Sequence, residues 1–198
     1  MGYRISWLAA KGLSAAKLLD HFALVSSDEP DEANEAAFSV TELPTGWTVL
    51  WSNDQTFASI ERCQPLSKLA PVLSCWVNET VMFSSANYFE NGDYRWFVGH
   101  NAQESPRDLA SGGDLPAQFE GIRTRLLAEQ DAEDADRAEV DFVFDIPLEL
   151  AQSVCGFKHD LCEFDWGTPQ FVGAERSAPI DVRSNPAKKN WFARLIGS

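Results

Sequence analysis

Alternation of apolar and polar positions is densest between residues 72 and 100, where β-branched and aromatic side chains predominate. Two such runs flank the segment Glu90-Asn91-Gly92-Asp93. An Asn-Gly pair between alternating runs is a strong signal for a two-residue hairpin turn. The pattern therefore predicts the central meander of an antiparallel sheet. Neither face of this meander is cleanly polar, so we expect both faces to be partly covered.

The register of this hairpin depends on the length of its loop. A two-residue turn at Asn91-Gly92 would place Phe89 opposite Tyr94. A three-residue loop would shift the pairing by one and place Tyr88 opposite Trp96. The choice matters because a shift by one residue moves the side chains of one strand to the other face.

The rest of the chain carries weaker signals of the same kind. Strands are expected over residues 3–8, on both sides of a turn at 43–46, over 140–144, and at one edge within 157–172. Helices are expected from Ser14 to about residue 22, over 115–127, over 145–155 and, as a short piece, near 65–69. The polar segments 26–35, 101–113 and 131–139 are expected as solvated connections.

These elements predict a single α+β domain over residues 1–182, with about five to seven antiparallel strands and two or three helices packed chiefly on one face. Residues 183–198 form a basic and aromatic tail that contains Trp191 and Phe192. Two interpretations of the tail stay open. It docks back onto the acidic body, or it is a mobile peptide that engages a partner or an anionic membrane surface.

Charge narrows the range of partners. The chain has 30 acidic and 16 basic residues, a net charge of −14, which disfavours nucleic acid because a phosphate backbone would be repelled. The same charge favours encounter with a basic protein. The densest run of carboxylates, named here the acidic lip, consists of Asp28, Glu29, Asp31, Glu32 and Glu35. It is interpreted either as plain solvated surface or as a partner-binding site.

Composition also bears on location. No apolar run of about 18 residues predicts a membrane span, and the first ten residues lack the features of a secretory signal. The four cysteines, in a chain with ample core, favour the reduced state and a cytoplasmic location. A phosphate-binding glycine loop, a dinucleotide fingerprint, a nucleophile elbow and a metalloprotease helix motif are absent, and no cofactor is expected.

Two groups of residues nevertheless offer chemistry. Cys155, His159 and Cys162 are three potential zinc ligands, although their spacing matches no standard site, and a thiol beside a histidine would also suit nucleophilic catalysis. Glu79 and His100 bound the central meander and would form an acid-base pair if they met at one end of the sheet.

The segment Cys75-Trp-Val-Asn-Glu-Thr-Val-Met-Phe-Ser-Ser-Ala86, the Asn-Gly turn and Trp96-x-Val98-x-His100 resemble a family of uncharacterised bacterial proteins. Leu115-Pro-Ala-Gln-Phe119, Arg125-Leu-Leu-Ala-Glu-Gln130 and Asp145-Ile-Pro-Leu-Glu-Leu-Ala151, followed by Gly156-Phe-Lys-His-Asp160, extend the likeness over residues 41–160. The resemblance implies a bacterial cytosolic domain and assigns no activity or site residue. In size, acidity and α+β character the chain is also similar to immunity proteins of bacterial toxin systems.

The leading functional hypothesis is a non-enzymatic protein-binding module, with an immunity-like inhibitor of a basic partner as its specific form. The first alternative is a hydrolase or metal-dependent enzyme that uses Glu79 and His100, or the Cys155, His159 and Cys162 group. The second alternative is a structural subunit of a larger assembly, tethered by the tail.

Overall fold

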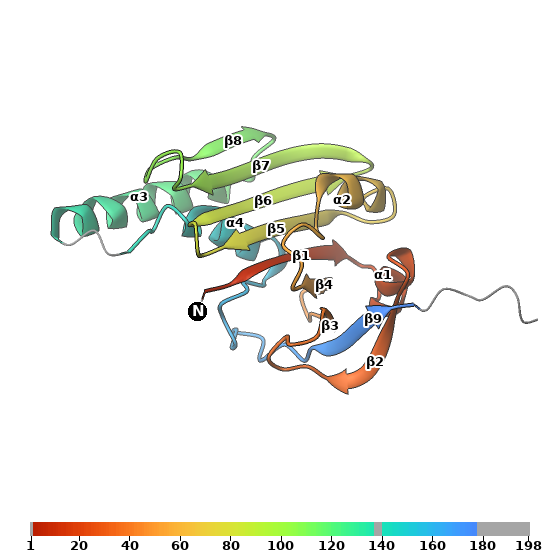
Figure 1. Cartoon of the computed structure of the whole chain (residues 1–198). Helices are drawn as coiled ribbons and strands as arrows, with labels where there is room; N and C mark the ends of the chain where they lie inside the picture. The colour runs from red at the N-terminus through yellow and green to blue at the C-terminus, as the bar shows by residue number, and fades with distance from the viewer. Residues whose placement is uncertain (1, 137–139, 178–198) are drawn as a thin grey trace, which may run out of the picture.

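A computed structural model describes residues 2–136 and 140–177 (Figure 1). The strands are β1 (Arg4–Lys11), β2 (Leu24–Pro30), β3 (Phe38–Glu42), β4 (Trp47–Ser52), β5 (Val72–Asn78), β6 (Phe83–Glu90), β7 (Asp93–Asn101), β8 (Ala110–Gly113) and β9 (Val172–Arg176). The helices are α1 (Ala15–His21), α2 (Ile60–Leu66), α3 (Gln118–Asp136) and α4 (Asp145–Cys155).

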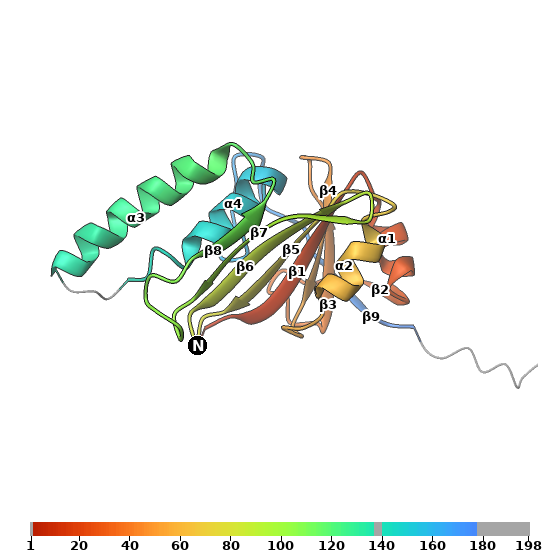
Figure 2. The same cartoon turned by 90° about the horizontal axis from the view of Figure 1, so that it is seen from above.

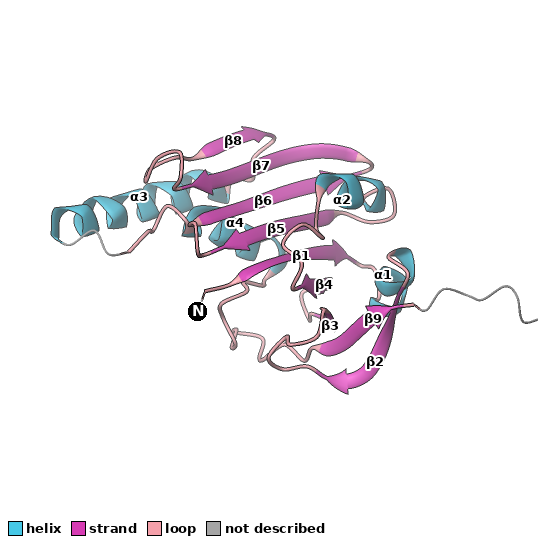
Figure 3. Cartoon of the chain, in the orientation of Figure 1, coloured by secondary structure: helices cyan, strands magenta, loops and turns pink. Residues whose placement is uncertain are grey.

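The strands form one sheet in the order β2-β9-β3-β4-β1-β5-β6-β7-β8, and each neighbouring pair is antiparallel (Figure 3). The single α+β domain with a mainly antiparallel sheet is confirmed. Both predicted counts were too low, because the described residues hold nine strands and four helices. Among these helices, none is long and apolar enough to cross a membrane.

The helices cover both faces of the sheet (Figure 2). Trp7, Leu73 and Val98 belong to the core under α3 and α4, whereas Leu8 and Leu50 belong to the core under α1 and α2. The prediction that helices lie chiefly on one face was wrong. The reason is visible in β1, a central strand whose residues 5–10 are all buried, so apolar surface on both sides needs a covering layer.

The central hairpin combines the two registers that the sequence left open. Next to the turn Phe89 pairs with Tyr94, as a two-residue loop requires, and both Asn91 and Gly92 have positive φ. One step further Tyr88 pairs with Trp96. Arg95 is therefore an extra residue in β7, a β-bulge that changes the register without changing the turn.

Several connections differ from expectation. Part of the predicted loop 26–35 is β2, a sheet edge that is exposed from Val25 onward. Residues 110–113 form β8 at the other edge, and residues 131–136 continue α3. The short helix expected near 65–69 lies earlier, over Ile60–Leu66.

Residues 140–144 do not form the predicted strand. Instead, the backbone N–H of Asp145 donates to the carbonyl of Phe142 at 3.2 Å, and that of Ile146 donates to Val143 at 3.2 Å. These contacts belong to a turn that leads into α4. Local hydrogen bonds within this apolar run take the place of a strand partner. The tail with Trp191 and Phe192, and the boundary at residue 182, lie outside the described residues.

Candidate functional site

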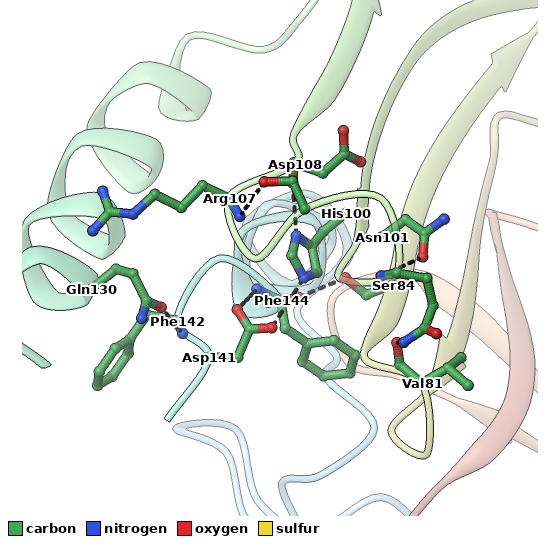
Figure 4. A network of polar contacts seen from close by, with 12 residues as sticks. Val81, Ser84, His100, Asn101, Arg107, Asp108, Gln130, Asp141, Phe142 and Phe144 are labelled. Carbon is green, nitrogen blue, oxygen red and sulfur yellow. Dashed lines mark hydrogen bonds and ion pairs between the residues drawn. The ribbon is translucent and has the colours of Figure 1, made fainter. Parts of the chain in front are cut away.

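His100 lies near the end of β7 and is completely buried (Figure 4). Its Nδ1 lies 2.7 Å from the carbonyl oxygen of Asp108, and its Nε2 lies 3.0 Å from Oδ2 of Asp141. Both partners accept, so both ring nitrogens donate when Asp141 is ionised. Burial by itself lowers the pKa of His100, but hydrogen bonds to Asp141 and Asp108 outweigh it and raise the pKa.

The surrounding contacts lock the chain that precedes α4. The hydroxyl of Ser84 donates to the carbonyl of Phe144 at 2.6 Å. The side-chain amide of Gln130 accepts from the N–H of Phe142 at 2.8 Å and donates to the carbonyl of Val140 at 3.2 Å. This network joins two strands, α3 and the turn. Because both nitrogens of His100 are engaged within it, the geometry supports a structural role for this histidine and leaves no free nitrogen for base catalysis.

Glu79, the predicted partner of His100, contacts other groups. Its Oε2 accepts from the backbone N–H of Tyr3 at 2.8 Å, and its Oε1 lies 3.7 Å from Nε2 of His159. Glu79 and His100 therefore do not form the acid-base pair that the sequence suggested. Each has a different partner at the same end of the sheet, where Phe83 pairs with both Asn78 and Asn101.

The proposed zinc ligands do not converge either. Cys155 is the last residue of α4 and is buried, with its Sγ 3.7 Å from the carbonyl oxygen of Phe157. Burial raises the pKa of the Cys155 thiol to about 12. Cys162 is exposed. Over residues 2–136 and 140–177 no three His, Cys, Asp or Glu side chains gather closely enough to hold a metal ion. Cys155, His159 and Cys162 therefore do not form the zinc site that their spacing in the sequence suggested.

A cavity of about 150 Å³ does form around His159. The chain between α4 and β9 passes close to the start of β1 in Figure 1, and the turn after β2 closes the cavity from another side. Its lining residues are Tyr3, Glu32, Ala33, Asn34, Trp51, Phe157, His159, Asp160, Leu161, Cys162, Thr168, Pro169 and Phe171. This space is called the His159 pocket below.

His159 is unusual among the buried polar groups. Its side chain is 1% exposed, yet neither ring nitrogen has a hydrogen-bond partner among the described residues. Nδ1 lies 4.0 Å from Oδ1 of Asp160, and the ring packs edge-on against Tyr3 with centroids 5.0 Å apart. Burial lowers the pKa of His159, against the opposing effects of Asp160 and Glu79. The neutral ring thus keeps one unsatisfied acceptor and one unsatisfied donor.

Asn34 adds a third unsatisfied atom among the residues that line the pocket. Its Oδ1 is buried without a hydrogen-bond partner in the described part of the chain, and its backbone φ of 53° lies in the left-handed region. Sequence reasoning did not single out Asn34. The only local signal was an asparagine in a polar turn, a residue type that tolerates positive φ.

Lys158 holds one wall of the pocket. Its Nζ lies 2.8 Å from Oδ1 of Asp145 and 3.0 Å from Oδ2 of Asp160, and the residue is 8% exposed. Burial lowers the pKa of Lys158, but the hydrogen bond and charge of Asp145 outweigh it and raise the pKa. The loop after α4 is thereby tied to the start of that helix, which places Asp160 at the pocket.

The acidic lip borders the same pocket. Asp31 is only half-buried and serves the turn, because its carboxylate accepts from the backbone N–H of Glu35 at 2.8 Å and from the hydroxyl of Ser39 at 2.5 Å. The other four lip residues are exposed: Asp28, Glu29, Glu32 and Glu35. Glu32 lines the pocket directly. The structure therefore joins two features that the sequence presented separately, the lip and His159.

Comparisons with protein-family models, curated proteins and solved structures found no match. The resemblance stated for residues 41–160 stays an expectation.

Proposed function

We propose that the protein is a non-enzymatic binding module that recognises a basic protein through the acidic lip and the adjoining His159 pocket. The observation that carries this proposal is the position of Glu32, which belongs to the exposed lip and also lines the pocket. A charged rim beside a concave, partly aromatic site is a common arrangement in protein recognition.

The charge distribution suits such a partner. Asp28 and Glu29 lie on the edge strand β2, where charged side chains also discourage uncontrolled pairing with other sheets. Together with the net charge of −14, the four exposed carboxylates accelerate encounter with a basic surface, an effect that weakens as salt rises. An immunity-like inhibitor would use this surface to cover the working face of its target.

The enzyme alternative draws less support from the geometry. Both nitrogens of His100 are engaged, Cys155 is buried as a neutral thiol, and Glu79 contacts His159 from outside the pocket lining. A nucleophile with an adjacent general base is the minimum that acyl transfer needs. The alternative of a tethered structural subunit rests on Trp191 and Phe192, which lie outside the described residues.

The test uses the whole chain as bait in a lysate of its native cells, at low and at moderate salt. A lip variant carries Asp28→Asn, Glu29→Gln, Glu32→Gln and Glu35→Gln. A control variant with the same charge change at exposed sites elsewhere carries Asp20→Asn, Asp93→Asn, Glu104→Gln and Glu120→Gln. Captured proteins are identified by mass spectrometry, and the purified pair is then measured by calorimetry.

We expect a basic protein that binds one-to-one, weakens as salt rises, and binds the lip variant about tenfold or more weakly than it binds the control variant. A partner that binds both variants with equal affinity would contradict recognition through the lip. A captured protein that is acidic, or whose affinity is independent of salt, would also refute the proposal.

A further inference from the structure

We propose that the His159 pocket holds the guanidinium group of an arginine side chain from the basic partner. This inference rests on the proposed function and names the part of the partner that enters the site. The starting observation is that most of the polar atoms without a hydrogen-bond partner at the pocket are acceptors.

Two acceptors of the pocket lack a donor, and a third group, a carboxylate, shares its donor with another carboxylate. Oδ1 of Asn34 is buried without a partner, the unprotonated nitrogen of His159 is likewise unpaired, and the carboxylate of Asp160 shares a single Lys158 with Asp145. A buried acceptor without a partner is energetically costly, so a guest that donates to several acceptors at once is favoured. Guanidinium has five N–H donors and no acceptor.

Local charge points in the same direction. Glu32 and Asp160 line the pocket, and Glu79 lies behind His159 with Oε1 3.7 Å from Nε2. Among the described residues Lys158 is the one lysine or arginine in contact with Asp160, and it divides its charge between two carboxylates. The surroundings are therefore net negative, which disfavours an anionic guest and favours a cation.

The shape of the walls distinguishes arginine from lysine. Tyr3, Trp51, Phe157 and Phe171 supply aromatic rings to the lining. A planar guanidinium stacks on such rings and is more weakly hydrated than an ammonium, so it loses less on entering a narrow aromatic pocket. The volume of about 150 Å³ accommodates a side-chain head group but no large ligand.

The first experiment titrates the full chain with acetyl-arginine amide, and separately with acetyl-citrulline amide and acetyl-lysine amide. The readout is the NMR signals of the ring nitrogens of His159, assigned by their loss in His159→Phe. We expect saturable binding of the arginine compound at about millimolar Kd, at least fivefold weaker binding of the lysine compound, and none of citrulline, which has the same shape without the charge. Equal binding of arginine and citrulline compounds would overturn the inference.

Matched variants assign the binding to the pocket. Asp160→Asn and Asn34→Ala should each weaken acetyl-arginine amide about fivefold or more, whereas Asp20→Asn, at an exposed site on α1, should leave the affinity unchanged. Two pocket variants are used so that misfolding of one does not decide the result. Unchanged affinity in both folded variants would place the cation elsewhere and refute the proposal.

A second arm separates a protein-borne arginine from a free small molecule. The peptide acetyl-Lys-Lys-Arg-Lys-Lys-amide should bind at least tenfold more tightly than acetyl-arginine amide. A lip variant restricted to the three exposed residues outside the pocket lining, Asp28→Asn, Glu29→Gln and Glu35→Gln, should remove that gain without changing the affinity for acetyl-arginine amide. If this restricted variant leaves the peptide unaffected, the pocket serves a free cation and its link to the partner is wrong. If the peptide depends on the lip but tolerates citrulline in place of arginine, the pocket assignment fails while the proposed function stands.

Discussion

Removal of the carboxylate at Asp141 is the sharpest test of how this fold is held together. In Asp141→Ala the completely buried His100 loses its partner at Nε2, and the backbone N–H of Phe144 loses the acceptor that now lies 3.1 Å away. Breaking a buried ion pair on one side costs about 3–5 kcal/mol. Because the Asp141 side chain is 19% exposed, we expect a loss near the lower limit, about 3 kcal/mol of the free energy of unfolding.

Asp141→Asn gives a graded comparison. The amide oxygen can still accept from Phe144, and the amide N–H can donate to a neutral His100 whose Nδ1–H keeps its bond to Asp108. Only the contribution of the charge to these hydrogen bonds is lost, so we expect the free energy of unfolding to fall by about 1–2 kcal/mol. The exposed pair Arg123 and Glu120, at 45% and 70% side-chain exposure, is the control, and Glu120→Ala should cost less than about 1 kcal/mol.

Urea unfolding followed by tryptophan fluorescence and circular dichroism measures these differences. The pKa of His100 is raised, so its stabilisation is complete below its ordinary pKa of about 6.5 and is lost as pH rises through the raised value. For Asp141, burial by itself raises the pKa, but the hydrogen bond from His100 and that from the backbone of Phe144 outweigh it and lower the pKa. Its stabilisation is therefore complete above the ordinary pKa of 3.8 and is lost as pH falls through the lowered value.

The difference in free energy of unfolding between the native chain and Asp141→Asn should therefore be largest between about pH 4 and 6.5. It should decrease as pH rises further. A loss below about 1 kcal/mol for Asp141→Ala, or equal losses for the two variants, would refute the ion-pair interpretation.

Three further results are expected. Gly113→Ala should destabilise the region around β8 by about 1–3 kcal/mol, because φ is +85° and the new Cβ would overlap the carbonyl oxygen of Arg95. Amide hydrogen exchange should accelerate in β8 while β1 stays protected, and equal acceleration in both strands would contradict this prediction. Cys162 alone should react rapidly with a thiol reagent in the folded chain, because Cys63, Cys75 and Cys155 are buried. All four cysteines should react in denaturant. His159→Phe should reduce the loss of stability that the native chain shows as pH falls from about 6.5 to about 4, because burial lowers the pKa of His159 and the folded state favours its neutral form. An unchanged pH profile of urea unfolding over this range would show that His159 is not the group responsible.

Local chemistry determined much of the fold. The Asn91-Gly92 turn occurs where the sequence predicted it, and α1 and α4 lie close to the predicted ranges. Ser14 caps the start of α1, and Gly156, with its φ of 85°, follows the end of α4. These features depend on the conformational preferences of a few adjacent residues, which are the same in the isolated segment and in the folded chain. The alternation in residues 72–100 likewise predicted the central antiparallel meander, which the structure forms from β5, β6 and β7.

Only the tertiary structure decided how distant segments meet. The bulge at Arg95 places Tyr94 against Phe89 on one face and Trp96 against Tyr88 on the other, a division that no turn signal specifies. Glu79 and His100 are closer in sequence than Glu79 and His159, yet the latter pair meet. The pocket joins Tyr3, Asn34 and His159, which are separated by up to 156 positions and are brought together because both faces of the sheet must be covered.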